Sequence, residues 1–299
     1  MPEDAGGYGV DIADALSLLR VAGEFALPLP LAETMIAGYL LAGAGIDIPD
    51  GPLTVAPVVA TDRLILTRNG DAWHLAGTAA RIPWARHAAA IAVLAEYNGA
   101  PHVALIAAGA FELTHGENLA REPRDMIHID AVPLAVAPTA LTPASLRALG
   151  AAARSLQIAG ALARIIAMTS QYAQDRVQFG RPIGKFQAVQ QNLAVLAGQT
   201  AAAGAASDLA AEAVANGIRV LPIAAAKSRC GEAASIGAGI AHQAHGAIGF
   251  TYEHNLHFFT KRLWSWRDEF GNESEWNLLL GRHMAEAGAD RLWSEITAV

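Results

Sequence analysis

The stretch Arg176–Gln190, RVQFGRPIGKFQAVQ, interrupts a series of long alanine-rich segments in the C-terminal half of the chain. Glycine and proline within Gly180–Gly184 disfavour a helix, whereas the flanking segments carry apolar residues three and four positions apart. One such segment runs from Pro143 to this stretch, and three more follow it: Phe186–Val214, Pro222 to about His245, and about Glu273 to Ile296. Because the connections are short, we expect a C-terminal four-helix bundle with antiparallel neighbours.

Towards the N-terminus the pattern changes to short strands. Runs rich in valine, leucine and isoleucine alternate there with turn residues, and Asn69–Asp71 has the composition of a hairpin turn. The expected strands contain residues 55–59, 64–66, 73–75, 91–94, 103–106 and 127–129. Two short helices are predicted within Asp11–Leu41, separated by Pro28 and Pro30. The sequence therefore predicts an α+β protein with a compact antiparallel sheet or barrel rather than a doubly wound parallel sheet.

Composition limits the classes of partner. The chain has 299 residues, 53% of them hydrophobic and 16% charged, and the charged share is below the usual quarter. We therefore expect much apolar surface to be buried, either within the chain or between subunits, and the second case makes an oligomer an expectation. The net charge is −7, so we expect no general electrostatic attraction to nucleic acid or to anionic lipid.

The sequence predicts a cytoplasmic protein. The N-terminal MPEDAGG has neither the basic start nor the apolar core of an export signal. The most apolar stretches contain proline or amide and hydroxyl side chains, so no membrane span is predicted. The single cysteine, Cys230, cannot form an internal disulfide, which fits a reducing compartment, and we expect it to be a small buried side chain.

Two segments carry side chains suited to binding. Arg176 offers planar donors for a phosphate, Gln178 can bond a ribose or phosphate oxygen, and Phe179 can lie against a heterocycle. An ordinary capping loop is the alternative, since arginine at a helix C-terminus is also favoured by the helix dipole. The second segment is HQAHGAIGFTYEH, His242–His254, in which Gly246 and Gly249 permit close approach of a ligand.

Both segments resemble the acyl-CoA dehydrogenase family, flavoenzymes that introduce a double bond between Cα and Cβ of an acyl-CoA thioester. RVQFGRPIGKFQAVQ is similar to the family signature that follows the first C-terminal helix. QAHGAIGF is similar to the pattern QxxGGxGF, with alanine in place of the second glycine. The resemblance implies three parts: residues 1–45, a shortened N-terminal helical domain that opens at PEDAGG; residues 46–140, a β-rich middle domain; and residues 141–299, the helical bundle.

The resemblance also implies a cofactor and partners. FAD would bind between subunits, with Arg176, Gln178 and Phe179 at its ADP half. Gln243, Gly246 and Ala247 would line the same cofactor. The substrate would be an acyl-CoA, and electrons would pass to an electron-transfer flavoprotein.

The expected catalytic base departs from the family pattern. Many members carry a glutamate in the loop before the last helix, and ungapped counting from Gly249 places Phe270 there. A shift of one residue makes Glu269 the base, with Asp268 and Glu273 as further candidates. A solvated or ion-paired surface role for Glu269 is the alternative. The other position used in the family, near residues 150–153, has no carboxylate here.

A further departure leaves two functions open. The middle-domain segment TExxGSD, which holds flavin and substrate in the family, has no counterpart, and the chain reads IDIPDGPLTVAPV over residues 46–58. The chain is then either a dehydrogenase subunit of a homo- or hetero-oligomer, or a non-catalytic partner that completes the FAD site of a full-length subunit. A flavin-dependent monooxygenase on the same fold is a third, weaker interpretation.

The histidines allow one more interpretation. His242 and His245, and then His254 and His257, form two HxxH pairs that could bind a metal. They lie within or next to the segment that resembles the flavin family and have no cysteine nearby. We therefore predict that none of them binds a metal ion and that they bond backbone carbonyls or a cofactor.

Overall fold

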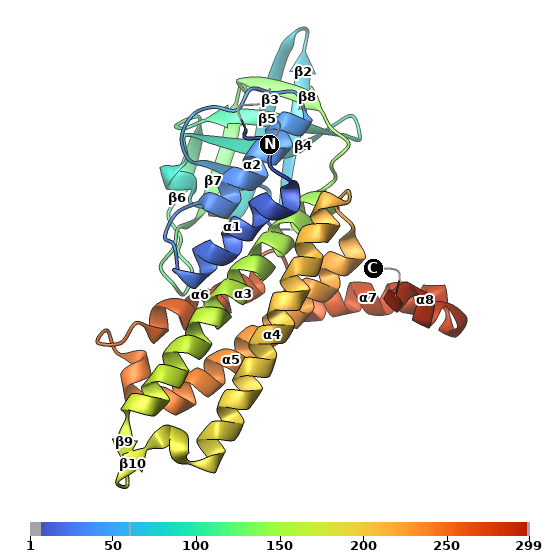
Figure 1. Ribbon diagram of the computed structural model, residues 1–299. Helices are drawn as coiled ribbons and strands as arrows, with labels where there is room; N and C mark the ends of the chain where they lie inside the picture. Colours follow the sequence, from blue (N-terminus) through green and yellow to red (C-terminus); the bar gives the residue numbers. More distant parts are fainter. Residues whose placement is uncertain (1–6, 60, 298–299) are drawn as a thin grey trace. The chain divides into compact units, whose positions relative to one another are not determined.

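A computed structural model describes residues 7–59 and 61–297, apart from the side chain of residue 296. The chain divides into two compact units (Figure 1). One comprises residues 7–15 and Pro28–Gly150, and the other Leu16–Leu27 and residues 151–297. The predicted three-part division, 1–45, 46–140 and 141–299, stays a prediction. Of the PEDAGG stretch, all residues but Gly7 lie outside the described ranges.

The first unit is built on an eight-stranded sheet. Its strands lie in the order β6-β7-β3-β2-β4-β5-β8, and β1 pairs with β4. The elements of this unit are α2 (Leu31–Gly43), β1 (Leu53–Ala56), β2 (Arg63–Asn69), β3 (Ala72–Pro83), η2 (Ala85–His87), β4 (Ala90–Tyr97), β5 (Ala100–Ala107), β6 (Phe111–Thr114), β7 (Arg124–Ala131) and β8 (Ala135–Pro138). Each predicted strand lies in one of these strands or overlaps it, whereas β6 and β8 were not predicted.

The predicted hairpin turn is confirmed. β2 and β3 are antiparallel and pair up to Asn69 and Ala72, and Gly70 adopts the positive φ of 60° that the tight turn needs. The sheet is not purely antiparallel, since β4 runs parallel to both β1 and β2. One face of the sheet carries a buried apolar cluster that includes Leu64, Leu66, Leu75, Ile91, Val93, Ile106, Ile127 and Ile129.

The second unit is helical. Its elements are α1 (Ile12–Glu24) from Leu16 onward, α3 (Pro143–Asp175) from residue 151 onward, β9 (Val177–Gln178), β10 (Arg181–Pro182), η3 (Ile183–Lys185), α4 (Gln187–Ala215), α5 (Val220–His245), η4 (Gly246–Phe250), α6 (Leu256–Asp268), α7 (Glu273–Ala287), η5 (Ala289–Arg291) and α8 (Leu292–Thr297). Its buried core joins α3, α4, α5 and α6 through side chains such as Ile158, Leu162, Leu196, Cys230, Leu256 and Trp266. The predicted burial of Cys230 is thus confirmed.

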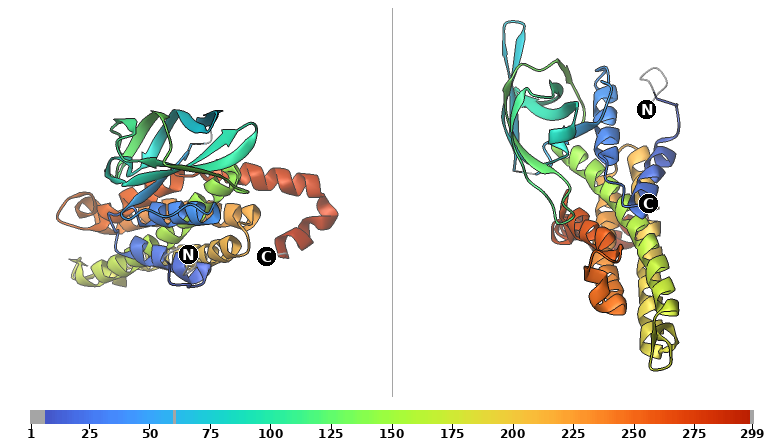
Figure 2. Two further views of the ribbon diagram at one scale, coloured as in Figure 1. Left: turned by 90° about the horizontal axis from the view of Figure 1, so that it is seen from above. Right: turned by 90° about the vertical axis from the view of Figure 1, so that its left-hand side faces the viewer.

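Two elements differ from the sequence prediction. α6 was not predicted, and it supplies Phe259, Leu263 and Trp266 to the bundle core. The predicted final helix breaks at Gly288, whose φ of 81° lies outside the helical region. In the left-hand view of Figure 2, α7 runs outward and the chain then reverses into α8.

Glycines allow α1 to lie directly on α3. A Cβ at Gly23 would lie 2.1 Å from the carbonyl oxygen of Gln157, and one at Gly160 would lie 1.9 Å from that of Arg20. No side chain fits at either position, so the two backbones meet at a separation that only glycine permits.

α3 is long and apolar enough to cross a membrane by length and composition alone. The amide and hydroxyl side chains within this helix are the reason that no membrane span was predicted from the sequence, although the helix as a whole is apolar. In the structure 72% of its most apolar window is buried, as in the core helix of a bundle.

Candidate functional site

The predicted binding stretch forms a tight hairpin at the C-terminal end of α3. β9 and β10 pair antiparallel, with Gln178 opposite Arg181. The two residues between them, Phe179 and Gly180, have φ values of 51° and 78°. Two successive positive φ values are typical of a type I′ turn, whose twist matches that of paired strands. The turn leaves the Phe179 side chain 92% exposed.

Contacts on its C-terminal side hold this hairpin. The backbone N–H of Ile183 donates to the carbonyl of Arg176 at 2.8 Å. The Arg181 guanidinium lies 4.3 Å from the centroid of the Phe186 ring, and Phe179 meets the same ring edge-on at 6.2 Å. Cation–π and aromatic contacts of this kind stabilise exposed loops modestly. These contacts therefore stabilise the hairpin although its tip is exposed.

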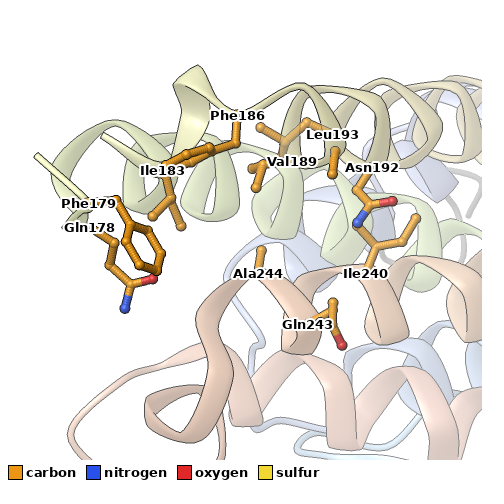
Figure 3. A pocket seen from close by; sticks show the side chains of 11 residues that line it. Gln178, Phe179, Ile183, Phe186, Val189, Asn192, Leu193, Ile240, Gln243 and Ala244 are labelled. Atoms are coloured by element: carbon orange, nitrogen blue, oxygen red, sulfur yellow. The ribbon is translucent and has the colours of Figure 1, made fainter. Parts of the chain in front are cut away.

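A pocket of about 290 Å³ lies between the hairpin, α4 and α5 (Figure 3). It is lined by Gln178, Phe179, Ile183, Phe186, Ala188, Val189, Asn192, Leu193, Ile240, Gln243 and Ala244. The structure thus brings three of the predicted site residues together: Gln178 and Phe179 from the hairpin and Gln243 from α5. Arg176, Gly246 and Ala247 are exposed but do not line this pocket.

A contact between α3 and α5 brings the two predicted segments together. The Tyr172 hydroxyl donates to the carbonyl of His245 at 3.3 Å, and the two rings stack at 4.4 Å. Tyr172 lies one turn before the hairpin, and His245 ends α5 just after Gln243. This contact fixes the ends of α3 and α5 beside each other.

The lining suits a ligand with polar atoms and a flat ring. Gln178, Asn192 and Gln243 present amide groups that donate and accept hydrogen bonds. Phe179 and Phe186 present ring faces and edges, and no carboxylate of the described residues lines the pocket. Uncharged donors and aromatic rings can bind an aromatic ring system and its polar substituents.

The sequence analysis missed part of this pocket. Ile183 and Phe186 lie inside the quoted stretch, but nothing in their types distinguishes them from core residues. Asn192 and Ile240 lie on different helices. They meet at one pocket only because of the faces that α4 and α5 turn towards each other. Sequence periodicity does not predict how two helices are rotated relative to one another.

The predicted base lies in an ion pair. Glu269 directly follows α6, and its Oε2 accepts from Arg154 Nε at 2.7 Å. The Arg154 side chain is 2% exposed and that of Glu269 is 16% exposed. Arg154 Nη1 also donates to the amide oxygen of Gln157 at 2.6 Å. The carboxylate is therefore oriented towards a buried cation of α3.

The other two predicted carboxylates differ from Glu269. Glu273, on α7, accepts from Arg267 Nε at 2.7 Å, and its ion pair helps to raise the pKa of that guanidinium above its usual value. Asp268 is exposed at the end of α6. Phe270, at the family position for the base, is 5% exposed and carries no titratable group.

The histidines are engaged by their own chain. His245 Nδ1 lies 2.8 Å from the Ala241 carbonyl, and His242 Nε2 lies 2.9 Å from the Thr260 hydroxyl. Burial lowers the pKa of both imidazoles below the usual value, so their neutral forms are favoured. Within the described part of the chain, no group of three or more histidine, cysteine or acidic residues is placed to hold a metal ion.

Known proteins match this chain in sequence and in fold. The family described as "Acyl-CoA dehydrogenase, C-terminal domain" matches residues 147–267. Acyl-CoA dehydrogenase IpdE2 of Mycobacterium tuberculosis is 30% identical over 274 residues, which cover 88% of this chain and 74% of the relative.

Two solved complexes are similar as well. The ChsE4–ChsE5 complex from Mycobacterium tuberculosis matches with a TM-score of 0.88 and 25% identity, over 96% of this chain and 84% of that chain. The Tcur3481–Tcur3483 steroid ACAD matches with a TM-score of 0.85 and 27% identity, over the same shares, 96% and 84%.

Proposed function

This chain belongs to the acyl-CoA dehydrogenase family, and we propose that it is one subunit of an oligomeric, FAD-dependent acyl-CoA dehydrogenase. The reaction would form a double bond between Cα and Cβ of an acyl-CoA thioester. In it a carboxylate would take the α-proton, and bound FAD would supply the acceptor for the β-hydride. Electrons would then leave to an electron-transfer flavoprotein.

The pocket between the hairpin, α4 and α5 carries this proposal. It collects Gln178, Phe179 and Gln243 from two segments that resemble the flavin-binding segments of the family. Phe179 is 92% exposed at its edge. A large aromatic side chain that a tight turn exposes to solvent suits a ligand or a subunit that covers it.

The residues present fit part of FAD. The amides of Gln178, Asn192 and Gln243 would bond polar atoms of the cofactor, and Phe179 would lie against its adenine or ribose. Arg176, exposed beside the hairpin, would add a cation for the pyrophosphate. Bound FAD would supply the hydride acceptor, and this chain's residues would hold the ADP half at the subunit boundary.

We propose a second acyl-CoA dehydrogenase chain as the partner. Residues 46–58 lack the family segment that holds flavin and substrate, so the rest of the cofactor site would come from another subunit. Two similar solved structures are named as pairs of chains, ChsE4–ChsE5 and Tcur3481–Tcur3483. A hetero-oligomer is therefore the assembly that we favour over a homo-oligomer.

The base is assigned to that partner. Glu269 Oε2 accepts from Arg154 Nε at 2.7 Å, and this contact turns the carboxylate towards α3 of its own chain. Phe270, beside it, has no acceptor atom in its side chain. We therefore favour the non-catalytic partner subunit over a self-sufficient dehydrogenase that uses Glu269.

The first experiment is the visible absorption spectrum of the purified chain, alone and after co-expression with a full-length family member. The proposal expects little flavin on the single chain, and flavin with acyl-CoA oxidation in the complex. Near-stoichiometric flavin on the chain alone would contradict the need for a partner. Loss of activity in a complex carrying Glu269→Gln, with flavin retained, would return the base to this chain.

A further inference from the structure

A buried lysine of α5 reaches the segment that joins α6 to α7. Lys227 is 1% exposed, and its Nζ donates to the carbonyl oxygens of Arg267 at 2.5 Å and Gly271 at 2.8 Å. These two carbonyls lie on either side of Asp268–Phe270. One amino group thus joins both ends of the turn that carries the predicted base.

The backbone of this turn needs such support. Phe270 has a φ of 56° and Gly271 a φ of 98°, and the left-handed region is unfavourable for a residue with a Cβ. The Arg267 carbonyl belongs to the last turn of α6, where carbonyls have no partner within the helix. Lysine side chains are suited to bonding such carbonyls. Lys227 therefore stabilises both the end of the helix and the strained turn.

The side chains of the turn dock on one residue of α3. Glu269 accepts from Arg154 Nε at 2.7 Å. The next residue, Phe270, is 5% exposed, and the Arg154 guanidinium lies 5.6 Å from its ring centroid. Since consecutive side chains point in different directions, both can meet Arg154 only in a particular backbone conformation of the turn.

We propose that Lys227 is a positioning residue that bridges the carbonyls of Arg267 and Gly271 and so fixes the turn that places the Glu269 carboxylate on Arg154. This inference rests on the proposed function in one respect. If the subunit is non-catalytic, the bridge made by Lys227 explains why the Glu269 carboxylate takes no part in proton transfer. Lys227 acts through Glu269 and not on a ligand.

The charge of Lys227 responds to its surroundings. Burial lowers its pKa to about 8, against the attraction of Glu273, Cys230, Glu269 and Asp268. A neutral amine still has two N–H groups, enough for the two carbonyls. The bridge should therefore persist above pH 8. Between pH 8 and 10.5 the unfolded chain binds the proton that the folded chain has lost, so stability should rise with pH in this window.

The test is chymotryptic cleavage after Phe270 in the full chain, measured relative to cleavage after the exposed Tyr252. Lys227→Met keeps the length of the side chain and removes its donors, and it should raise this ratio at least tenfold. Ile223→Ala, one turn earlier on α5 and also buried, is the matched control. It should lower overall stability and leave the ratio within about twofold, because an aliphatic side chain donates no hydrogen bond to the loop carbonyls.

Measurements over a range of pH distinguish the hydrogen-bonding role of Lys227 from its contribution to packing. The stability of the wild type relative to Lys227→Met should increase from pH 8 to 10.5, and the wild-type cleavage ratio should stay constant over that range. Equal ratios in Lys227→Met and wild type at pH 7.5 would overturn the proposal. So would opening of the wild-type loop as the amine loses its proton.

Amine acylation of the wild-type chain keeps the proposal testable if Lys227→Met does not fold. The other two lysines, Lys185 and Lys261, are more accessible and serve as references. Chains acylated at Lys227 should be the ones cleaved after Phe270. Protection of Phe270 in acylated chains would contradict the bridge. Neither readout uses flavin or activity, so failure of the bridge is distinguishable from failure of the proposed function.

Discussion

Arg154 and Glu269, 115 positions apart in the chain, meet through an Nε to Oε2 hydrogen bond of 2.7 Å. The arginine is almost fully buried and the carboxylate is partly exposed. A buried pair of this kind contributes little net stability compared with apolar residues, yet removing one partner is costly because the other charge stays buried. Replacing Glu269 and replacing Arg154 should therefore lower the unfolding free energy by different amounts.

Removal of the carboxylate charge should be the more damaging change. Glu269→Gln leaves the guanidinium buried without the facing negative charge and should cost about 3 kcal/mol of unfolding free energy. Arg154→Met should cost less, because the partly exposed Glu269 can be solvated. Urea denaturation of the single variants and the double variant measures their coupling, which we expect at about 2 kcal/mol. Additive effects would show that the pair is not coupled.

Phe179→Ala should separate binding from stability. The side chain is 92% exposed, so the unfolding free energy of the single chain should change by less than about 0.5 kcal/mol. In the co-expressed complex the flavin-to-protein ratio should fall several-fold, because the ring would contact the cofactor. Trp293→Ala removes another exposed aromatic residue, 75% exposed and outside the pocket, and should leave that ratio unchanged. An equal fall of the flavin-to-protein ratio in both variants would mean that Phe179 has no specific contact with the cofactor.

The fold could be predicted where periodicity is strong. α4 and α5 follow the alanine and leucine spacing to within two residues of the expected ends. α6 was missed although Leu256, Phe259 and Leu263 lie three and four positions apart and all are buried. Aromatic side chains are frequent in that stretch and lower its helix propensity, so its helical signal is weaker than that of α4 or α5.

The site could be predicted only as separate segments. The types of Gln178 and Phe179 indicated binding, Gln243 followed from the resemblance to the family, and the fold brought the three to one pocket. The partner of Glu269 could not be foreseen, since the contact with Arg154 depends on how α3 packs beside the end of α6. Long-range register of this kind is set by packing of the whole bundle, and local sequence does not encode it.

The contact between α1 and α3 should leave no room for one additional methyl group. Gly160→Ala would place its Cβ 1.9 Å from the Arg20 carbonyl oxygen and should destabilise the chain by about 3 kcal/mol, as overpacking does. Gly198→Ala, on α4, has no neighbouring atom within 4 Å and should stabilise by about 0.5–1 kcal/mol through helix propensity. Thermal unfolding of the two variants should thus shift in opposite directions. A shift of the same sign in both would contradict the close approach of α1 to α3.

Acid should destabilise the histidine region. Burial lowers the pKa of His242 and His245 below the usual 6.5, so below pH 6.5 the unfolded chain binds protons that the folded chain does not. The contribution of these two neutral imidazoles to the unfolding free energy is therefore fully present above pH 6.5. It falls as the pH decreases, by up to about 1.4 kcal/mol per pH unit and group.

His245→Phe tests this dependence, because it keeps a ring against Tyr172 and removes one titrating group. The variant loses the hydrogen bond to the Ala241 carbonyl, so it should be less stable at pH 7.5. Its unfolding free energy should then decline less steeply than that of the wild type between pH 6.5 and 5. His115→Phe, a substitution in an exposed loop, is the control for loss of a histidine. If the slopes of wild type and His245→Phe coincide, the acid sensitivity comes from other groups, and the buried imidazole of His245 does not supply it.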